Sequence, residues 1–358
     1  MWLQLRGRFL NRIKLFCLAL FGFKSSELLA QIPDTMPKSI IQEIEWQSGV
    51  YLQDGEHSAV TGGEGTEKLQ VYRNKFAFSK TKTGRYTYQL SGGVDFITSA
   101  STDNIDFDDS SASRHDVHTY VQVAYGRTLP KSKAEVQLAT GLAFESDYLS
   151  IPLKASLRYP SHSRNYNLEL EAFFDDLRWG RLSEGFFNPV ELIYPSELRN
   201  QEWHDTHERK TYNFKFGLEQ VINKRSNAAL LLQMTYQKGL LSTPFHRVIF
   251  NDGEKRVEQL PSERFRFPLG LRWNYFLNAN SIIKMELDYY VDNFGIDAVS
   301  GRVEWVRYLK TGVSLKPHLS LYKQSASKYF KPFEEHDPTD TITLQTMTCP
   351  DSLVSKPV

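Results

Sequence analysis

Acidic residues and histidines gather in two stretches that separate apolar segments of the chain. "DGEHSAVTGGEGTE" carries Asp54, His57 and Glu64, and "TDNIDFDD" carries Asp103 and Asp106. Ca²⁺ takes about 6 to 8 oxygen ligands in flexible geometry, so oxygen-rich loops of this kind can collect it. Neither stretch has the ligand spacing of an EF-hand. Two interpretations stay open: a Ca²⁺ site in external loops, or solvated acidic loops that bind counterions loosely.

A third stretch, "EWHDTHER", brings His204 and His207 close together in the sequence. Both could bind zinc from one turn of helix, but the sequence fixes no third ligand. Serine, histidine and aspartate residues are plentiful, yet none lies in a recognisable nucleophile turn. We therefore expect no catalytic residues, no resident cofactor and no enzymatic activity.

Charged residues also alternate with large apolar ones. In "RFRFPLGLRWNYF", apolar side chains occupy the odd positions from Phe265 to Tyr275, and Arg264, Arg266 and Arg272 lie between them. A period of two is typical of a β-strand with one apolar and one polar face. "NYNLELEAFF" and "IIKMELDYYV" repeat the pattern with acidic and basic residues on their polar faces.

We predict that the polar faces of these strands line the lumen of a barrel. Mixed charges in such a lumen can form a weakly selective aqueous channel or structural ion pairs, and both interpretations stay open. The predicted lumen-facing charged residues are Arg264, Arg266, Arg272, Glu169, Glu171, Lys284 and Glu286.

Thirteen segments share this alternation, and most of them reach the 9 to 11 residues or so that a strand needs to cross a bilayer. They are expected at 43–52, 69–79, 86–98, 115–127, 133–145, 148–159, 165–175, 211–222, 227–239, 263–276, 281–292, 297–309 and 313–325. Every long connection follows an odd-numbered segment, which is typical of barrels with short turns on one rim and long loops on the other. Pro152, Pro268 and Pro317 lie inside segments, where each lacks a hydrogen-bond donor.

These patterns predict an all-β fold: a transmembrane, antiparallel, up-and-down β-barrel of about 14 strands in the bacterial outer membrane. The barrel must close, because lipid offers no partner to a sheet edge. A soluble β-sandwich, whose polar face contacts water, is the alternative. The expected partners are outer-membrane lipid, lipopolysaccharide and the barrel-insertion machinery.

The N-terminus has the layout of a secretory signal peptide, with Arg6, Arg8, Arg12 and Lys14 before an apolar run. We expect a signal peptide at 1–30, a short periplasmic segment at 31–42, the barrel at 43–340 and an atypical tail at 341–358. No stretch in the body of the chain approaches 18 apolar residues, which excludes a bundle of transmembrane helices. The formal net charge of +1 favours no nucleic-acid partner.

Several stretches resemble a known family. "ELIYPSELR", "GLLSTPFHRVIF", "LPSERFRFPLGLRWNYF" and "YYVDNFGIDA" are similar to the bacterial domain-of-unknown-function family 3570, over roughly residues 43 to 340. The resemblance implies an exported outer-membrane barrel and brings no catalytic residues. It also implies a genomic association with flavin-transferase and thioredoxin-like proteins.

The chain departs from this family at its C-terminus, where "DPTDTITLQTMTCPDSLVSKPV" shows weak alternation. Either residues 341–347 supply a poor fourteenth strand or the barrel is truncated. For function, we expect a channel or transport-type barrel, or an accessory envelope component. The alternative is a scaffold that partners a periplasmic redox system of flavin or thioredoxin-like type.

Overall fold

The computed structural model describes residues 39–53, 69–98, 115–145, 148–177, 208–242, 247–310, 313–332 and 334–345. All of them belong to the compact unit Met36–Val358. The expected signal peptide lies outside the described residues, and the domain division stays a prediction. Within the described ranges, no helix is long and apolar enough to cross a membrane.

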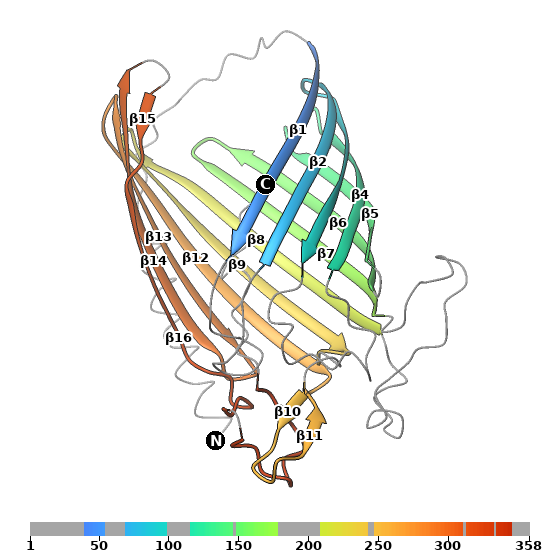
Figure 1. The fold of residues 1–358 in the computed structure, drawn as a ribbon. Coiled ribbons are helices and arrows are strands. Elements are labelled where there is room, and N and C mark those ends of the chain that lie inside the picture. The colour runs from blue at the N-terminus through green and yellow to red at the C-terminus, as the bar shows by residue number, and fades with distance from the viewer. Residues whose placement is uncertain are drawn as a thin grey trace. The chain divides into compact units, whose positions relative to one another are not determined.

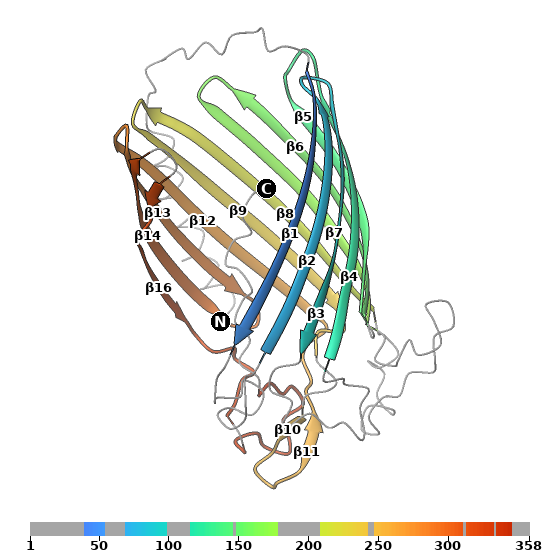
Figure 2. The same cartoon turned by 45° about the horizontal axis from the view of Figure 1, so that its top comes forward.

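One antiparallel sheet dominates the fold, and its strands follow one another in chain order from β1 to β9 and on through β12, β13 and β14 (Figure 1). β14 then pairs with both β15 and β16. Figure 2 shows the same order from blue β1 to red β16 around a curved sheet. The prediction of an all-β, antiparallel, up-and-down fold of about 14 strands is confirmed. The strands are β1 (Ile40–Gln53), β2 (Leu69–Lys82), β3 (Tyr86–Thr98), β4 (His115–Thr128), β5 (Glu135–Phe144), β6 (Tyr148–Ser161), β7 (Arg164–Leu177), β8 (Glu208–Asn223), β9 (Ser226–Gly239), β12 (Glu263–Asn278), β13 (Ser281–Asp292), β14 (Asp297–Lys310), β15 (Val313–Leu315) and β16 (His318–Gln324).

The prolines mark the places where the ladder is interrupted. The predicted strand 313–325 is divided into β15 and β16 at Lys316 and Pro317. Pro317 has no N–H to donate, but its carbonyl accepts a hydrogen bond from the Trp305 N–H at 3.0 Å. Pro152 and Pro268 lie inside β6 and β12. Strand pairing continues on both sides of them, so each costs local hydrogen bonds and leaves the strand intact.

The register gives the sheet two distinct faces. Leu271 of β12 lies opposite Leu230 of β9 and Leu287 of β13, whereas the next residue, Arg272, lies opposite Ala229 and Glu286. Alternate residues of a strand point to opposite faces. The apolar face therefore continues from strand to strand, and so does the polar face.

A second, smaller sheet lies in the connection from β9 to β12, where the sequence predicted none. β10 (Arg247–Ile249) pairs with β11 (Lys255–Val257). Strands of three residues are too short to show a period of two, which is why the pattern did not predict them. We call residues 247–260 and 325–345 together the rim cap, because they lie beyond the end of the main sheet where β9 and β16 finish (Figure 1).

The C-terminal segment packs into this rim cap. Thr343 forms an isolated bridge with Gln259, and Leu344 forms one with Phe330. The hypothesis that residues 341–347 add a fourteenth strand to the sheet is wrong for the described part of that segment. Thr343 exchanges backbone hydrogen bonds with Gln259, and the Leu344 carbonyl accepts one from Lys331, so the segment pairs with the rim cap and not with the main sheet.

Candidate functional site: the charged polar face

The centre of the polar face holds four charged side chains, which we call the lysine–glutamate square. Lys154 Nζ lies 2.6 Å from Glu169 and 3.5 Å from Glu171, and Lys215 Nζ lies 2.8 Å from Glu169 and 2.7 Å from Glu171. Each lysine thus contacts both glutamates. The residues come from β6, β7 and β8, and the four side chains are 12% to 23% exposed. The square fastens three strands together and still reaches solvent.

A second group, the Arg272 cluster, spans β12, β13 and β14. The Arg272 guanidinium lies 2.6 Å from Asp288 and 3.9 Å from Glu286. Glu304 of β14 lies 3.2 Å from Lys284 of β13 and 2.8 Å from Arg302 of β14. These six residues make up the cluster. Positive and negative groups alternate across the strands, as cross-strand pairs of opposite charge do when they stabilise a sheet.

Three arginine–aspartate pairs lie at the end of the polar face from which the long connections leave. Arginine Nε donates to aspartate Oδ2 in each: Arg73 to Asp95 at 3.1 Å, Arg209 to Asp175 at 2.9 Å and Arg264 to Asp292 at 2.9 Å. The three aspartate side chains are 7%, 4% and 0% exposed, respectively. Because a buried charge is stable only when it is paired, these pairs lock neighbouring strands at this rim.

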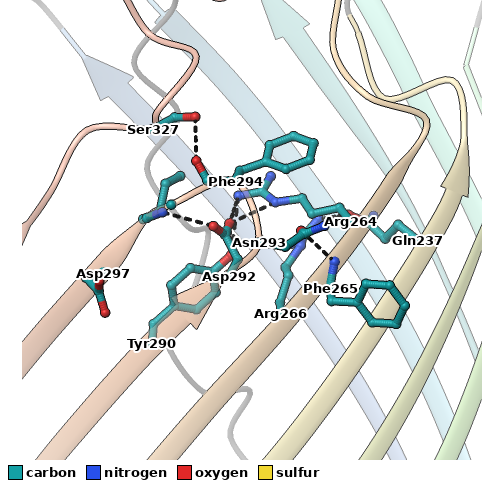
Figure 3. Close-up of polar contacts among 12 residues, drawn as sticks. Gln237, Arg264, Phe265, Arg266, Tyr290, Asp292, Asn293, Phe294, Asp297 and Ser327 are labelled. Carbon is teal, nitrogen blue, oxygen red and sulfur yellow. Dashed lines mark hydrogen bonds and ion pairs between the residues drawn. The ribbon is translucent and has the colours of Figure 1, made fainter. Parts of the chain in front are cut away.

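Figure 3 shows the most buried of these pairs. Asp292 accepts hydrogen bonds from Arg264, from the Tyr290 hydroxyl at 2.9 Å and from the Ile296 N–H at 3.0 Å. The Arg264 guanidinium also lies 4.7 Å from the centre of the Phe294 ring. The pair therefore fixes the turn between β13 and β14.

The seven predicted lumen-facing residues all lie on the polar face, but they fall into different groups. Glu169 and Glu171 belong to the square, and Arg272, Lys284 and Glu286 belong to the Arg272 cluster. Arg264 is held in the rim pair, and Arg266 donates to the Gln237 side chain in the same region (Figure 3).

Sequence reasoning missed the buried rim aspartates Asp95, Asp175 and Asp292 as partners of arginine. Each shares the polar phase of its strand and lies within three residues of the strand's end. Alternation could have placed them on this face. The identity of each partner depends on cross-strand register, which alternation does not encode.

The metal candidates cannot be placed in the same way. Asp54, His57, Glu64, Asp103 and Asp106 lie outside the described residues, as do His204 and His207. Among the residues that the structure does describe, no group of three histidine, cysteine, aspartate or glutamate side chains is arranged to hold a metal ion. The Ca²⁺ and zinc hypotheses stay predictions.

The opposite face of the sheet is uncharged between its two rims. Its charged side chains all lie within three residues of a strand end in the described strands. They are Lys80, Lys82, Arg127, Arg164, Glu208, Lys210, Lys238, Glu263, Asp297, Arg307 and Lys323. On β12 the regular alternation before the irregularity at Phe276–Asn278 places uncharged side chains on this face from Phe265 to Tyr275. Ten residue steps cover about 34 Å along a strand at about 3.4 Å each, or about 26 Å at a barrel tilt near 40°.

Aromatic side chains flank this uncharged band. Tyr212, Tyr236 and Phe265 stack in a row at the long-connection end, with ring centres 6.4 and 4.6 Å apart. At the opposite end, the indole N–H groups of Trp273 and Trp305 donate to serine hydroxyls on neighbouring strands, both at 2.6 Å. Their rings lie on the apolar face, and their N–H groups are satisfied by the protein.

The apolar face also carries a groove with a volume of about 1050 Å³. Its lining includes the small residues Ala155 and Ala172 and aromatic side chains such as Tyr125 and Phe214. The lining is mostly apolar but also includes Gln89, Lys154, Glu171 and Asn213.

The rim cap contains a fully buried histidine. His336 Nδ1 lies 3.0 Å from Asp340 Oδ2, and Nε2 lies 3.3 Å from the Leu344 carbonyl oxygen. Both ring nitrogens thus have a hydrogen-bond partner within the cap. The hydrogen bond from Lys331 lowers the pKa of Asp340 from 3.8 to about 2, and His336 adds to this effect. These contacts fasten the cap and leave no open position for a ligand.

Comparison with known proteins identifies a family without a described function. The family "Protein of unknown function (DUF3570)" matches residues 109–353. No curated protein matches the chain.

Two solved structures from Pseudomonas are similar to the chain at low identity. A mutant of the ferric enterobactin receptor PfeA from Pseudomonas aeruginosa is 13% identical, with a TM-score of 0.40 over 78% of this chain and 44% of the receptor. The chain thus spans less than half of that receptor's length. An outer membrane channel from Pseudomonas putida F1 is 11% identical, with a TM-score of 0.36 over 82% of this chain and all of the channel. At these TM-scores neither likeness bears on function.

Proposed function

The chain belongs to the DUF3570 family, and we propose that it is a β-barrel of the bacterial outer membrane whose polar face lines a passage for solutes. The observation that carries the proposal is the separation of the two faces. One face is apolar and free of charge between its rims across the described strands, and the other carries the square and the Arg272 cluster.

The height of the uncharged band supports a bilayer as the medium that this face contacts. The roughly 26 Å estimated above matches the apolar band of about 25 Å that outer-membrane barrels present to lipid. Aromatic residues border it at both ends, and charged residues follow them toward the rims on β9 and β14, as Lys238 follows Tyr236 and Arg307 follows Trp305. A soluble protein gains nothing from keeping charge out of such a band, because water solvates a charged side chain at every height.

The burial of the polar face supports its role as a lumen. The side chains of the square and the Arg272 cluster are 12% to 42% exposed, whereas Leu138 and Leu319 on the apolar face are 58% and 65% exposed. Side chains converge on the concave side of a curved sheet and diverge on its convex side. We therefore assign the polar face to the inside.

Adjacent residues on β9 allow a direct test of the medium on each side. Ala229 lies on the polar face and Leu230 on the apolar face at the same depth. In a variant whose two native cysteines are replaced by serine, Ala229→Cys in intact proteoliposomes should react with a water-soluble maleimide, and Leu230→Cys should not. Equal labelling of both sites would contradict the membrane assignment.

The passage itself is tested by conductance of the folded protein in planar bilayers. Stepwise ion currents are expected, and protein that is shown to be inserted but carries no current would contradict the transport role. The alternative role, a scaffold for a periplasmic redox system, stays a prediction that site-specific cross-linking in cells can examine.

A further inference from the structure

We propose that the passage has no preference for ions of either sign and suits uncharged or zwitterionic polar solutes. This inference rests on the proposed function, because it concerns the solute class of the same polar face. It follows from the way in which the charges of the square and the Arg272 cluster are paired.

The lysine–glutamate square carries two positive and two negative groups in mutual contact. All four of its Lys–Glu distances lie between 2.6 and 3.5 Å. Glu171 is further held by Asn213, which donates to it at 3.3 Å. No single charge of this group projects toward the solvent without its counter-charge beside it.

The Arg272 cluster repeats this balance with three positive and three negative groups. Arg272 contacts Asp288 and Glu286, while Lys284 and Arg302 share Glu304. Ser300 donates to Asp288 at 3.4 Å as well. The cluster thus has formal net charge zero, as the square has, and the two lie on different parts of the sheet.

Neutral clusters act on a passing ion differently from rings of one charge. Channels that select by charge use rings of like-charged side chains, whose potentials add in the pore. In a neutral cluster the opposed potentials cancel within a few ångströms, and salt screens the remainder over about 8 Å at physiological ionic strength. The clusters offer a polar solute hydrogen-bond partners of both kinds without attracting either kind of ion.

The reversal potential in a salt gradient across a planar bilayer tests this directly. The wild-type protein should give a cation-to-anion permeability ratio near one. Lys215→Gln leaves one lysine to balance two glutamates and should raise the ratio severalfold. The upper limit is about thirtyfold, because a unit charge at about 4 Å in water favours a cation about fivefold and disfavours an anion about fivefold. Adding Glu169→Gln to that variant should restore the ratio to near one.

Arg158→Gln is the matched control, because the Arg158 side chain is 56% exposed near the short-turn end and its guanidinium lies 3.8 Å from Glu135. It removes one positive charge outside both clusters and should change the ratio by less than about 1.5-fold, since exposed charges are well screened. If Lys215→Gln does not insert, Arg272→Gln, with and without Asp288→Asn, repeats the test on the other cluster.

A solute assay separates the proposed classes. Proteoliposomes should swell at similar rates in glucose and in the zwitterion glutamine, and ionic gluconate should gain no advantage. A wild-type ratio far from one, or a double variant that stays selective, would overturn the inference while the transport role stands. Protein that is inserted but carries no current would contradict both the proposed transport function and this inference.

Discussion

Replacing Leu287 by arginine tests the proposed bilayer contact at a single position. Leu287 lies in the middle of β13 on the apolar face, between Leu271 of β12 and Gly301 of β14, and it is 49% exposed. In water, a substitution at such an open position changes the free energy of unfolding by no more than about 0.5 kcal/mol. At the midplane of a bilayer, arginine on the lipid face costs about 2 to 4 kcal/mol.

The destabilisation caused by Leu287→Arg should therefore be at least about 1.5 kcal/mol greater in a bilayer than in water. This is the lower bilayer value of about 2 kcal/mol minus the upper value in water of about 0.5 kcal/mol. Val299→Arg is the control, because Val299 lies on the same face of β14 but only two residues from Asp297 at the rim. Near an interface arginine costs about 0 to 1 kcal/mol. Denaturant unfolding of each variant from lipid vesicles measures both values. Equal costs at the two positions would refute the placement of Leu287 at the bilayer centre.

Three further changes test other parts of the fold. Arg264→Ala leaves the fully buried Asp292 without its counter-charge, so it should lower the free energy of unfolding from vesicles by about 3 to 5 kcal/mol. Adding Asp292→Asn should recover part of that loss. Gly93→Ala should be destabilising by about 1 to 3 kcal/mol in the same assay, because its Cβ would lie 2.8 Å from a backbone oxygen, whereas Gly301→Ala, with nothing within 4 Å, should show no clash. Folding lowers the pKa of Asp340 from 3.8 to about 2, so the ionised Asp340 should stabilise the rim cap fully above about pH 4 and lose this effect as the pH falls toward 2. Amide hydrogen exchange of the rim cap measures this pH dependence, and Asp340→Asn should remove it.

The strands could be predicted from the sequence because the alternation of apolar and polar residues continues along most of each long strand. A period of two sustained over ten or more residues, as in β7 and β12, identifies both the strand and its two faces. β10 and β11 have three residues each, and no periodicity can be recognised in so short a segment. Their formation depends on packing around Val248 and Phe250, which are fully buried in the rim cap.

The candidate site was predictable only in part, for a related reason. Alternation assigned Arg264 and Arg272 to the polar face, but it could not tell that one is locked at a buried rim pair and the other belongs to a central cluster. Arg264 pairs with Asp292, a residue 28 positions away. That partnership is set by register between strands, so a list of polar-face charges overstates how many are free to act on a solute.

Register and direction also determine how the cylinder can close. Every neighbouring pair in the sheet is antiparallel, and thirteen spanning segments, with β15 and β16 taken as one, lead from β1 to β16. An odd number of alternating segments makes the first and the last run in the same direction. Among the described residues β1 and β16 are not paired with each other. Direct closure between them would be parallel, with evenly spaced, slanted hydrogen bonds, whereas an all-antiparallel cylinder requires one more strand running against both edges. Since lipid cannot satisfy an open edge, a disulfide between cysteines placed on β1 and β16 in membranes would establish the parallel closure.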